Sequence, residues 1–163
     1  MIIGKIKEHI LTYEAGRLRV NLLLNRASPW ADVDSHLPYT GQVEVRVKQP
    51  LNLAIRIPEW VTPDQVTCQV QGQPRPLTFA GRYAQVGAVQ PDQVATLAFP
   101  LAEQTDTVWI EKAQYILVRK GNEVVHIEPQ GKTCPLYQRA HYRVSGTRWR
   151  QIERFVPSQT LFW

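Results

Sequence analysis

The sequence predicts an all-β fold, an antiparallel two-sheet β-sandwich of the jelly-roll type with little or no helix. Apolar residues recur at every second position in several short runs. Clusters of Pro, Gly and Asp separate these runs, as in turns between strands. No segment has the apolar spacing of a three-turn amphipathic helix. These observations are typical of strands with one face toward a core and the other toward water.

Four segments carry the clearest alternation, and each predicts a strand with one apolar face. The side chains expected to face the core are Leu18, Val20, Leu22 and Leu24, then Val43, Val45 and Val47, then Leu53, Ile55 and Ile57, and finally Leu97, Phe99 and Leu101.

Three further segments complete the expected elements. Residues 114–129 predict a hairpin that turns over residues 120–123. Residues 2–14 are interpreted either as an edge strand or as a lead-in from something upstream. Residues 62–66, with the sequence TPDQV, predict a turn or a single helical turn.

The length and composition predict one β-sandwich domain over residues 1–163. A chain of this size can bury a core, and 44% apolar with 20% charged residues is ordinary for a globular protein. No apolar run is long enough to cross a bilayer, so no membrane partner is expected. Residues 1–10 are too charged for a signal peptide, which makes a cytoplasmic location the default expectation.

The positive charge gathers in residues 132–163, a basic aromatic tail with six basic residues and one acidic residue. We expect this tail to pack on the sandwich or on a partner. Its candidate interface residues are Tyr137, Arg139, Tyr142 and Trp149, because Trp, Tyr and Arg dominate protein interfaces. Arginines among aromatics can also grip single-stranded nucleic acid. The tail has no known nucleic-acid-binding motif, however, so no nucleic acid is expected as a partner.

The sequence contains no recognisable catalytic motif. It lacks a nucleophile elbow, a phosphate loop and a dinucleotide fingerprint. Glycoside hydrolysis usually needs two carboxylates across the scissile bond, and no pattern pairs any two of Glu59, Glu111 and Glu128. We therefore expect no catalytic residue in this chain.

No metal or other cofactor is expected either. Residues 32–36 place Asp32, Asp34 and His36 at alternate positions, which suits a metal site but suits Asx-turns better. Cys68 is interpreted as a small buried apolar side chain. A disulfide between Cys68 and Cys134 stays open.

Several stretches in fixed order carry a resemblance to a known family. They include RVNLLLNRASPW, GQVEVRV, LAIRIPEWV, VTCQVQGQP, a Tyr-containing strand ending in LAFPL, and YILVRKGNEVV. In this order, over residues 18–125, the chain resembles the region after the catalytic barrel in the β-L-arabinofuranosidase-like glycoside hydrolases, family 127 and its relatives. RIPEW is the most specific element. Gln71 and the Gln90-Pro91-Asp92 turn depart from the family pattern.

The resemblance implies a non-catalytic accessory β-sandwich with a structural or interaction role. The family's thiolate nucleophile, zinc-binding cysteines and glutamates lie in an upstream helical barrel, and no position here matches them. The implied partners are the missing barrel domain or a second copy of the chain.

Trp60, the last residue of RIPEW, has three interpretations: a structural plug at the edge of the sandwich, a seam with the missing barrel, or a sugar-stacking platform. The third gives the alternative function, a carbohydrate-binding module for a polysaccharide. Its candidate residues are Trp60, Arg56, Glu59 and Trp30.

Overall fold

The computed structural model describes residues 9–130 and 139–146 and is all-β, as the sequence predicts. The described residues divide into two compact units. The sandwich unit contains residues 9–35 and 42–99, and the three-stranded unit contains residues 36–41, 100–130 and 139–146. The single domain expected over residues 1–163 stays a prediction, as does the packing of the 132–163 tail. In the described part of the chain, no helix is long and apolar enough to span a membrane.

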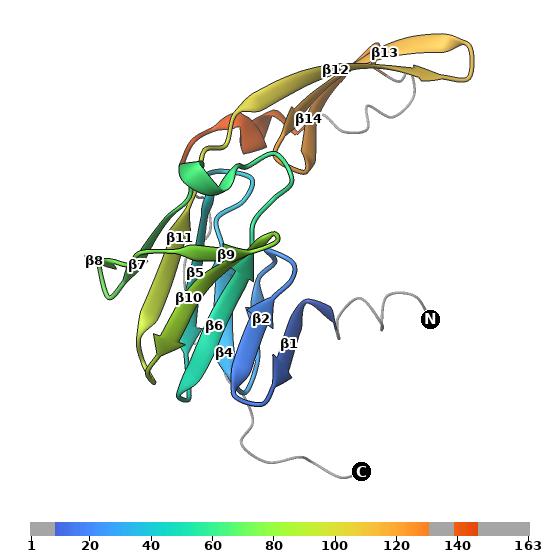
Figure 1. Ribbon diagram of the computed structural model, residues 1–163. Coiled ribbons are helices and arrows are strands. Elements are labelled where there is room, and N and C mark those ends of the chain that lie inside the picture. Colours follow the sequence, from blue (N-terminus) through green and yellow to red (C-terminus); the bar gives the residue numbers. More distant parts are fainter. Residues whose placement is uncertain (1–8, 131–138, 147–163) are drawn as a thin grey trace, which may run out of the picture. The chain divides into compact units, whose positions relative to one another are not determined.

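The sandwich unit is built from two sheets (Figure 1). The first sheet has the strand order β1 (Leu11–Glu14), β2 (Arg17–Val20), β6 (Leu51–Arg56), β10 (Tyr83–Val89) and β9 (Thr78–Ala80). The second has the order β3 (Arg26–Ala27), β4 (Ala31–Ser35), β5 (Gln42–Val47), β11 (Val94–Ala98), β7 (Thr67–Val70) and β8 (Gln73–Pro74). Neighbouring strands are antiparallel except β2 and β6, which are parallel.

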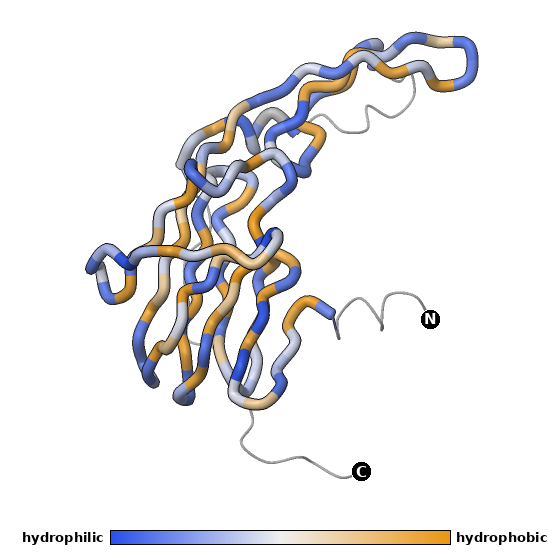
Figure 2. The backbone as a smooth tube through the Cα atoms, in the orientation of Figure 1, coloured by the Kyte–Doolittle hydropathy of each residue, from blue (hydrophilic) through white to orange (hydrophobic). Residues whose placement is uncertain are grey.

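The core of the sandwich unit consists of the alternating apolar residues of both sheets. The alternation along the strands is visible in Figure 2. Side chains with no more than 1% of their surface exposed include Leu18, Val20, Val43, Val45, Val47, Leu53, Ile55, Ile57 and Leu97. The period of two therefore predicted correctly which face of these strands is buried.

The prediction was wrong at Leu22 and Leu24, which are 38% and 50% exposed. Strand β2 ends at Val20, because the amides of Asn21 and Leu22 both donate to the carbonyl of Ile10 (2.9 and 3.4 Å). The chain thereby leaves the β2–β6 ladder, and the period of two no longer decides which side chains are buried. Residues 11–14 form β1 at the edge of the first sheet, as the edge-strand interpretation requires.

A tight turn joins β1 to β2. Ala15 and Gly16 occupy its two central positions with φ of 47° and 76°. Two positive φ values give a turn whose twist matches that of the flanking strands. Further along the chain, the predicted single helical turn is present as the 3₁₀ helix η1 (Pro63–Gln65).

The three-stranded unit contains β12 (Glu103–Ile110), β13 (Ala113–Lys120), β14 (Glu123–Glu128) and the short 3₁₀ helix η2 (Ala140–Arg143). The strands form an antiparallel sheet in chain order. The β13–β14 turn falls where the sequence predicts it, with Gly121 at φ 62°. The sequence did not predict β12, whose apolar residues do not alternate into a buried face.

Candidate binding face of the first sheet

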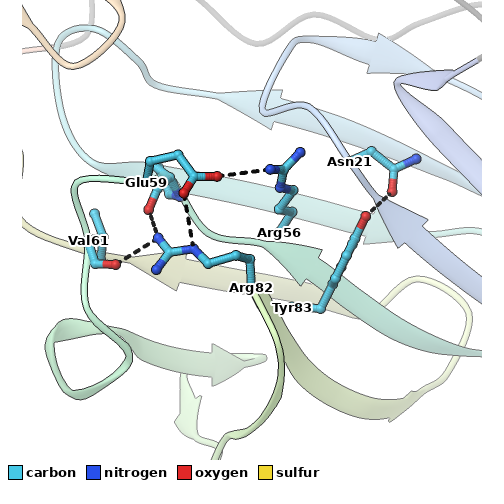
Figure 3. Close-up of polar contacts among 7 residues, drawn as sticks. Asn21, Arg56, Glu59, Val61, Arg82 and Tyr83 are labelled. Carbon is cyan, nitrogen blue, oxygen red and sulfur yellow. Dashed lines mark hydrogen bonds and ion pairs between the residues drawn. The ribbon is translucent and has the colours of Figure 1, made fainter.

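The RIPEW segment ends β6 and begins a loop that polar contacts hold in place (Figure 3). Arg56 Nη2 donates to Glu59 Oε1 at 2.9 Å, so the structure brings these two predicted residues together. Arg82 Nη2 donates to the carbonyls of Pro58 and Val61, the latter at 2.8 Å. Arg82 Nε lies 4.0 Å from Glu59 Oε2. Two arginines therefore surround the Glu59 carboxylate, and Arg82 also clamps the loop backbone.

Trp60 lies in this clamped loop and is half-buried. Its Nε1 is buried and has no hydrogen-bond acceptor among the residues that the structure describes. The indole is thus a partly covered side chain, and in the sequence it directly follows Glu59 of the Arg56–Glu59 pair. Its role as a plug, a seam or a platform stays a prediction.

Trp30 lies in a different environment, immediately before β4 of the second sheet. Its indole stacks on the ring of Tyr13, with ring centroids 4.9 Å apart and planes inclined by 14°. One face of Trp30 is therefore covered by a protein ring. The four predicted carbohydrate-binding residues divide into the Arg56–Glu59–Trp60 loop and a separate Tyr13–Trp30 stack.

A second polar network lies next to the RIPEW loop on the first sheet. Tyr83 Oη donates to Asn21 Oδ1 at 2.8 Å (Figure 3). Asn21 Nδ2 donates to the His9 carbonyl at 2.9 Å and approaches Thr12 Oγ1 at 3.3 Å. Because Asn21 follows β2, Thr12 lies in β1 and Tyr83 begins β10, these bonds tie three strands together on one side of the sheet.

That side is the outer face of the first sheet, the face away from the core. In β2 and β6 the buried pairs Leu18–Leu53 and Val20–Ile55 alternate with Arg17–Asn52, both exposed, and with Arg19–Ala54, of which Arg19 is exposed and Ala54 is covered. In β1, Thr12 lies opposite Arg19. The period of two thus gathers polar side chains of three strands on one surface.

A cavity of about 420 Å³ lies on this outer face, and we call it the outer groove. It is lined by Thr12, Glu14, Ala15, Arg17, Arg19 and Asn52. The lining offers guanidinium and amide donors, a hydroxyl and a single carboxylate. Sequence reasoning missed this groove, although the outward polar positions of RLRV and LNLAIR were a usable signal.

The three-stranded unit contains two of the four predicted interface residues. Arg139 Nη1 donates to Glu123 Oε2 at 2.7 Å, and its backbone amide donates to the Val125 carbonyl at 3.1 Å. Tyr142 meets Tyr39 edge to face, with ring centroids 5.6 Å apart. Tyr137 and Trp149 lie outside the described residues.

Lys120 is the buried charge of this unit, 5% exposed. Its Nζ donates to the carbonyls of Tyr39, Tyr142, Arg143 and Val144 at 2.8–3.3 Å. Burial lowers the pKa of Lys120, and the nearby Glu103 carboxylate opposes that shift. Sequence reasoning missed Lys120, which reads as an ordinary turn-flanking lysine.

Glu103 forms a bidentate ion pair with Arg143, at 2.7 Å to Nε and 2.6 Å to Nη2. The hydrogen bond from Arg143 lowers the pKa of Glu103 below its ordinary value of 4.5. The planar guanidinium matches the carboxylate in this two-bond geometry.

The described residues contain no group of three or more His, Cys, Asp or Glu side chains that would hold a metal ion. Asp32 Oδ1 lies 2.9 Å from Lys48 Nζ, so this carboxylate has a cationic partner. Cys68 is a buried free thiol, 5% exposed, as predicted. Burial raises its pKa, which disfavours the reactive thiolate.

No family model matches the sequence, and no curated protein matches it at a significant level. Solved structures do match. A protein described as a glycoside hydrolase has a TM-score of 0.54 at 20% identity, over 70% of this chain and 22% of its own. This chain shares its fold with part of a glycoside hydrolase.

Two further matches name the family expected from RIPEW. A GH127 β-L-arabinofuranosidase from Geobacillus stearothermophilus T6 has a TM-score of 0.54 at 18% identity, over 76% of this chain and 22% of its own. A GH127 β-arabinofuranosidase has a TM-score of 0.51 at 14% identity, over 71% of this chain and 23% of its own. The resemblance to family 127 is therefore confirmed in the fold, and this chain spans less than a quarter of those enzymes.

Proposed function

We propose that this chain is a non-catalytic accessory β-sandwich of a glycoside hydrolase resembling the β-L-arabinofuranosidases, with a structural and interaction role. The main support is the coverage of the structural matches. They extend over 70–76% of this chain but only 22–23% of the enzymes. The chain therefore corresponds to less than a quarter of each matched enzyme, and most of the enzyme has no counterpart in it.

The chemistry of the outer face supports a role without catalysis. Glu14 is the one carboxylate that lines the outer groove. Glu59 has Arg56 and Arg82 as cationic neighbours. Hydrolysis by the usual mechanism needs two carboxylates facing each other across a bond. Neither glutamate has such a partner among the residues that line the groove or form the loop network.

Exposed apolar side chains support the interaction role. On the β12–β13 hairpin, Trp109 is 70% exposed, Ile110 52% and Ile116 44%. Ile116 lies opposite Thr107, so Ile116 and Trp109 share one face of the hairpin, whereas Ile110 lies on the other face. Exposed aromatic and aliphatic side chains on one face, such as Trp109 and Ile116, are typical of protein interfaces. We assign this surface to a partner, either the catalytic barrel domain or a second copy of the chain.

The test has two arms. The purified chain should hydrolyse nitrophenyl β-L-arabinofuranoside no faster than buffer. An affinity-tagged chain expressed in its source organism should co-purify with glycosidase activity, or sediment as a dimer when purified alone. Trp109→Ser should abolish the association, whereas Leu24→Ser, an equally apolar exposed site in the sandwich unit, should leave it intact. Hydrolysis by the chain alone, or a monomer that captures no glycosidase activity, would contradict the proposal.

A carbohydrate-binding module is the second candidate, supported by the exposure of Arg56 and Glu59 beside Trp60. Their side chains are 43% and 73% exposed, so they can hydrogen-bond a sugar next to the indole. Trp30, stacked on Tyr13, would contribute at most one ring face. Titration of the chain with arabino-oligosaccharides, followed by tryptophan fluorescence, should give binding that Trp60→Ala removes and Trp109→Ala retains. Equal binding by both variants would exclude this role for Trp60.

A further inference from the structure

The arginines of the sandwich unit divide into those with partners and those without. Arg56 pairs with Glu59, Arg82 binds loop carbonyls, and Arg75 Nη1 donates to the carbonyls of Val86 and Ala88. Arg17 and Arg19 have no ion pair or side-chain hydrogen bond with any residue that the structure describes. Both line the outer groove. Two guanidinium groups with unused donors therefore face the same cavity.

The strand geometry places these two side chains on the same face. Residues two apart on one strand point to the same face and lie about 7 Å apart. Arg17 and Arg19 thus present two forks along β2, flanked by Asn52 on β6 and Thr12 on β1.

We propose that the outer groove binds a carboxylate-bearing saccharide, a uronic acid unit within an oligosaccharide. Arg17 and Arg19 provide the bidentate donors that match a carboxylate. Asn52 and Thr12 provide hydrogen-bonding groups for ring hydroxyls, and Glu14 accepts from a hydroxyl at the end of the groove. This inference rests on the proposed role beside a glycoside hydrolase, which makes a saccharide the ligand that carries the carboxylate.

The outer face is also long enough for more than one sugar unit. Arg17 and Arg19 line the groove, and just past the end of β2 the side chain of Asn21 is bonded to Thr12 and Tyr83. A row of three polar side chains suits a linear oligosaccharide better than a single small anion.

The direct test is calorimetric titration of the full chain with trigalacturonate and with its methyl ester, which has the same hydroxyls and no charge. The acid should bind, and the ester should bind about tenfold more weakly or not at all, because it lacks the charge-assisted bonds. The double variant Arg17→Gln/Arg19→Gln should weaken binding of the acid by about tenfold or more. Arg17→Lys/Arg19→Lys should retain the charge but lose several-fold in affinity, because lysine has no planar fork.

The control is Arg46→Gln, which removes one positive charge, half of what the double variant removes, from an exposed position of β5 in the second sheet. It should leave affinity for trigalacturonate within about twofold, since a distant exposed charge is screened. Near-equal affinity for acid and ester, an equal loss from Arg46→Gln, or absence of binding to trigalacturonate would overturn the proposal. Equally tight binding of tripolyphosphate would also overturn it, because the site would then attract anions in general.

The outcomes separate this inference from the proposed function. If trigalacturonate does not bind but the chain still co-purifies with glycosidase activity, the groove assignment fails and the accessory role stands. If the chain alone hydrolyses the arabinofuranoside, the accessory role fails whatever the groove binds.

Discussion

The two units of this molecule are both built from β-strands but bury their apolar side chains to very different extents. In the sandwich unit, alternate apolar side chains such as Val45 and Leu53 are almost completely buried because a second sheet covers them. Among the described residues of the three-stranded unit, the apolar side chain that is buried is Val125. Trp109 and Ile110 are neighbours in β12 and point to opposite faces, yet both are exposed. An apolar stripe therefore becomes a core only where another layer packs on it.

What replaces a core in the three-stranded unit is a set of polar links. The Lys120 ammonium donates hydrogen bonds to four carbonyls, and Arg143 donates two to the Glu103 carboxylate. Hydrogen bonds to a charged, buried donor are costly to break. The following predictions test this contrast, from the largest expected effect to the smallest.

Leu53→Ala should lower the free energy of unfolding by about 3 kcal/mol, because it removes a side chain that is 1% exposed and leaves a cavity. Ile116→Ala in the other unit should cost less than about 1 kcal/mol, since that side chain is 44% exposed. Urea denaturation of both variants measures the difference. Similar losses would show that the hairpin is buried in solution, and the contrast between the units would then fail.

Lys120→Met should destabilise the three-stranded unit by about 2 kcal/mol, because it leaves four carbonyls without their shared donor. Hydrogen exchange should report faster opening of β13 and β14 and unchanged protection of β6. Lys48→Met is the control in the sandwich unit, where the side chain is 27% exposed, pairs with Asp32 and donates to the Ser28 carbonyl at 2.9 Å. It should cost less than Lys120→Met, because it leaves one carbonyl without its donor instead of four, and an equal effect of the two variants would argue against the polar links.

Ala15→Gly should stabilise the sandwich unit by about 0.5 kcal/mol. Ala15 has φ of 47°, a region that costs alanine energy and that glycine adopts freely. Thermal unfolding should show a small rise in Tm. Ala54→Gly, at an ordinary strand position in β6, should lower Tm instead.

The smallest effect should come from acid. The folded pKa of Glu103 lies below its ordinary value of 4.5, so its contribution to stability is fully present above about pH 4.5. This contribution to stability is lost as the pH falls through the pKa that Glu103 has in the folded state. The protection factors of the β12 amides, which correct for the intrinsic exchange rate, should therefore fall as the pH drops below about 4.5, and Glu103→Gln should remove this pH dependence. Unchanged pH dependence in this variant would show that the ion pair does not contribute.

The sequence predicted the sandwich core well because a buried face imposes the period of two on every strand that shares it. Val43, Val45 and Val47 could be assigned from the pattern alone. The sequence failed at Leu22 and Leu24 because a ladder ends when backbone amides find other acceptors, here the Ile10 carbonyl. The pattern of apolar and polar side chains does not indicate where such a ladder ends.

The candidate site was predicted less completely than the core. Arg56 and Glu59 lie three apart in the sequence, and the structure pairs them. Arg82 reaches the same loop from a distant part of the chain, and Arg17 meets Asn52 only because β2 runs beside β6. Such neighbours depend on the order of strands in the sheet, which period and propensity do not encode.

The parallel pairing of β2 with β6 has a consequence for how the chain folds. Between these two neighbours the polypeptide crosses to the opposite layer and builds β3, β4 and β5 before it returns. The amino-terminal hairpin must therefore wait for a distant segment, and closing so long a loop slows the search for the native topology. Neither sheet of the sandwich can be completed before the other, so we expect the sandwich unit to fold in one slow, cooperative step.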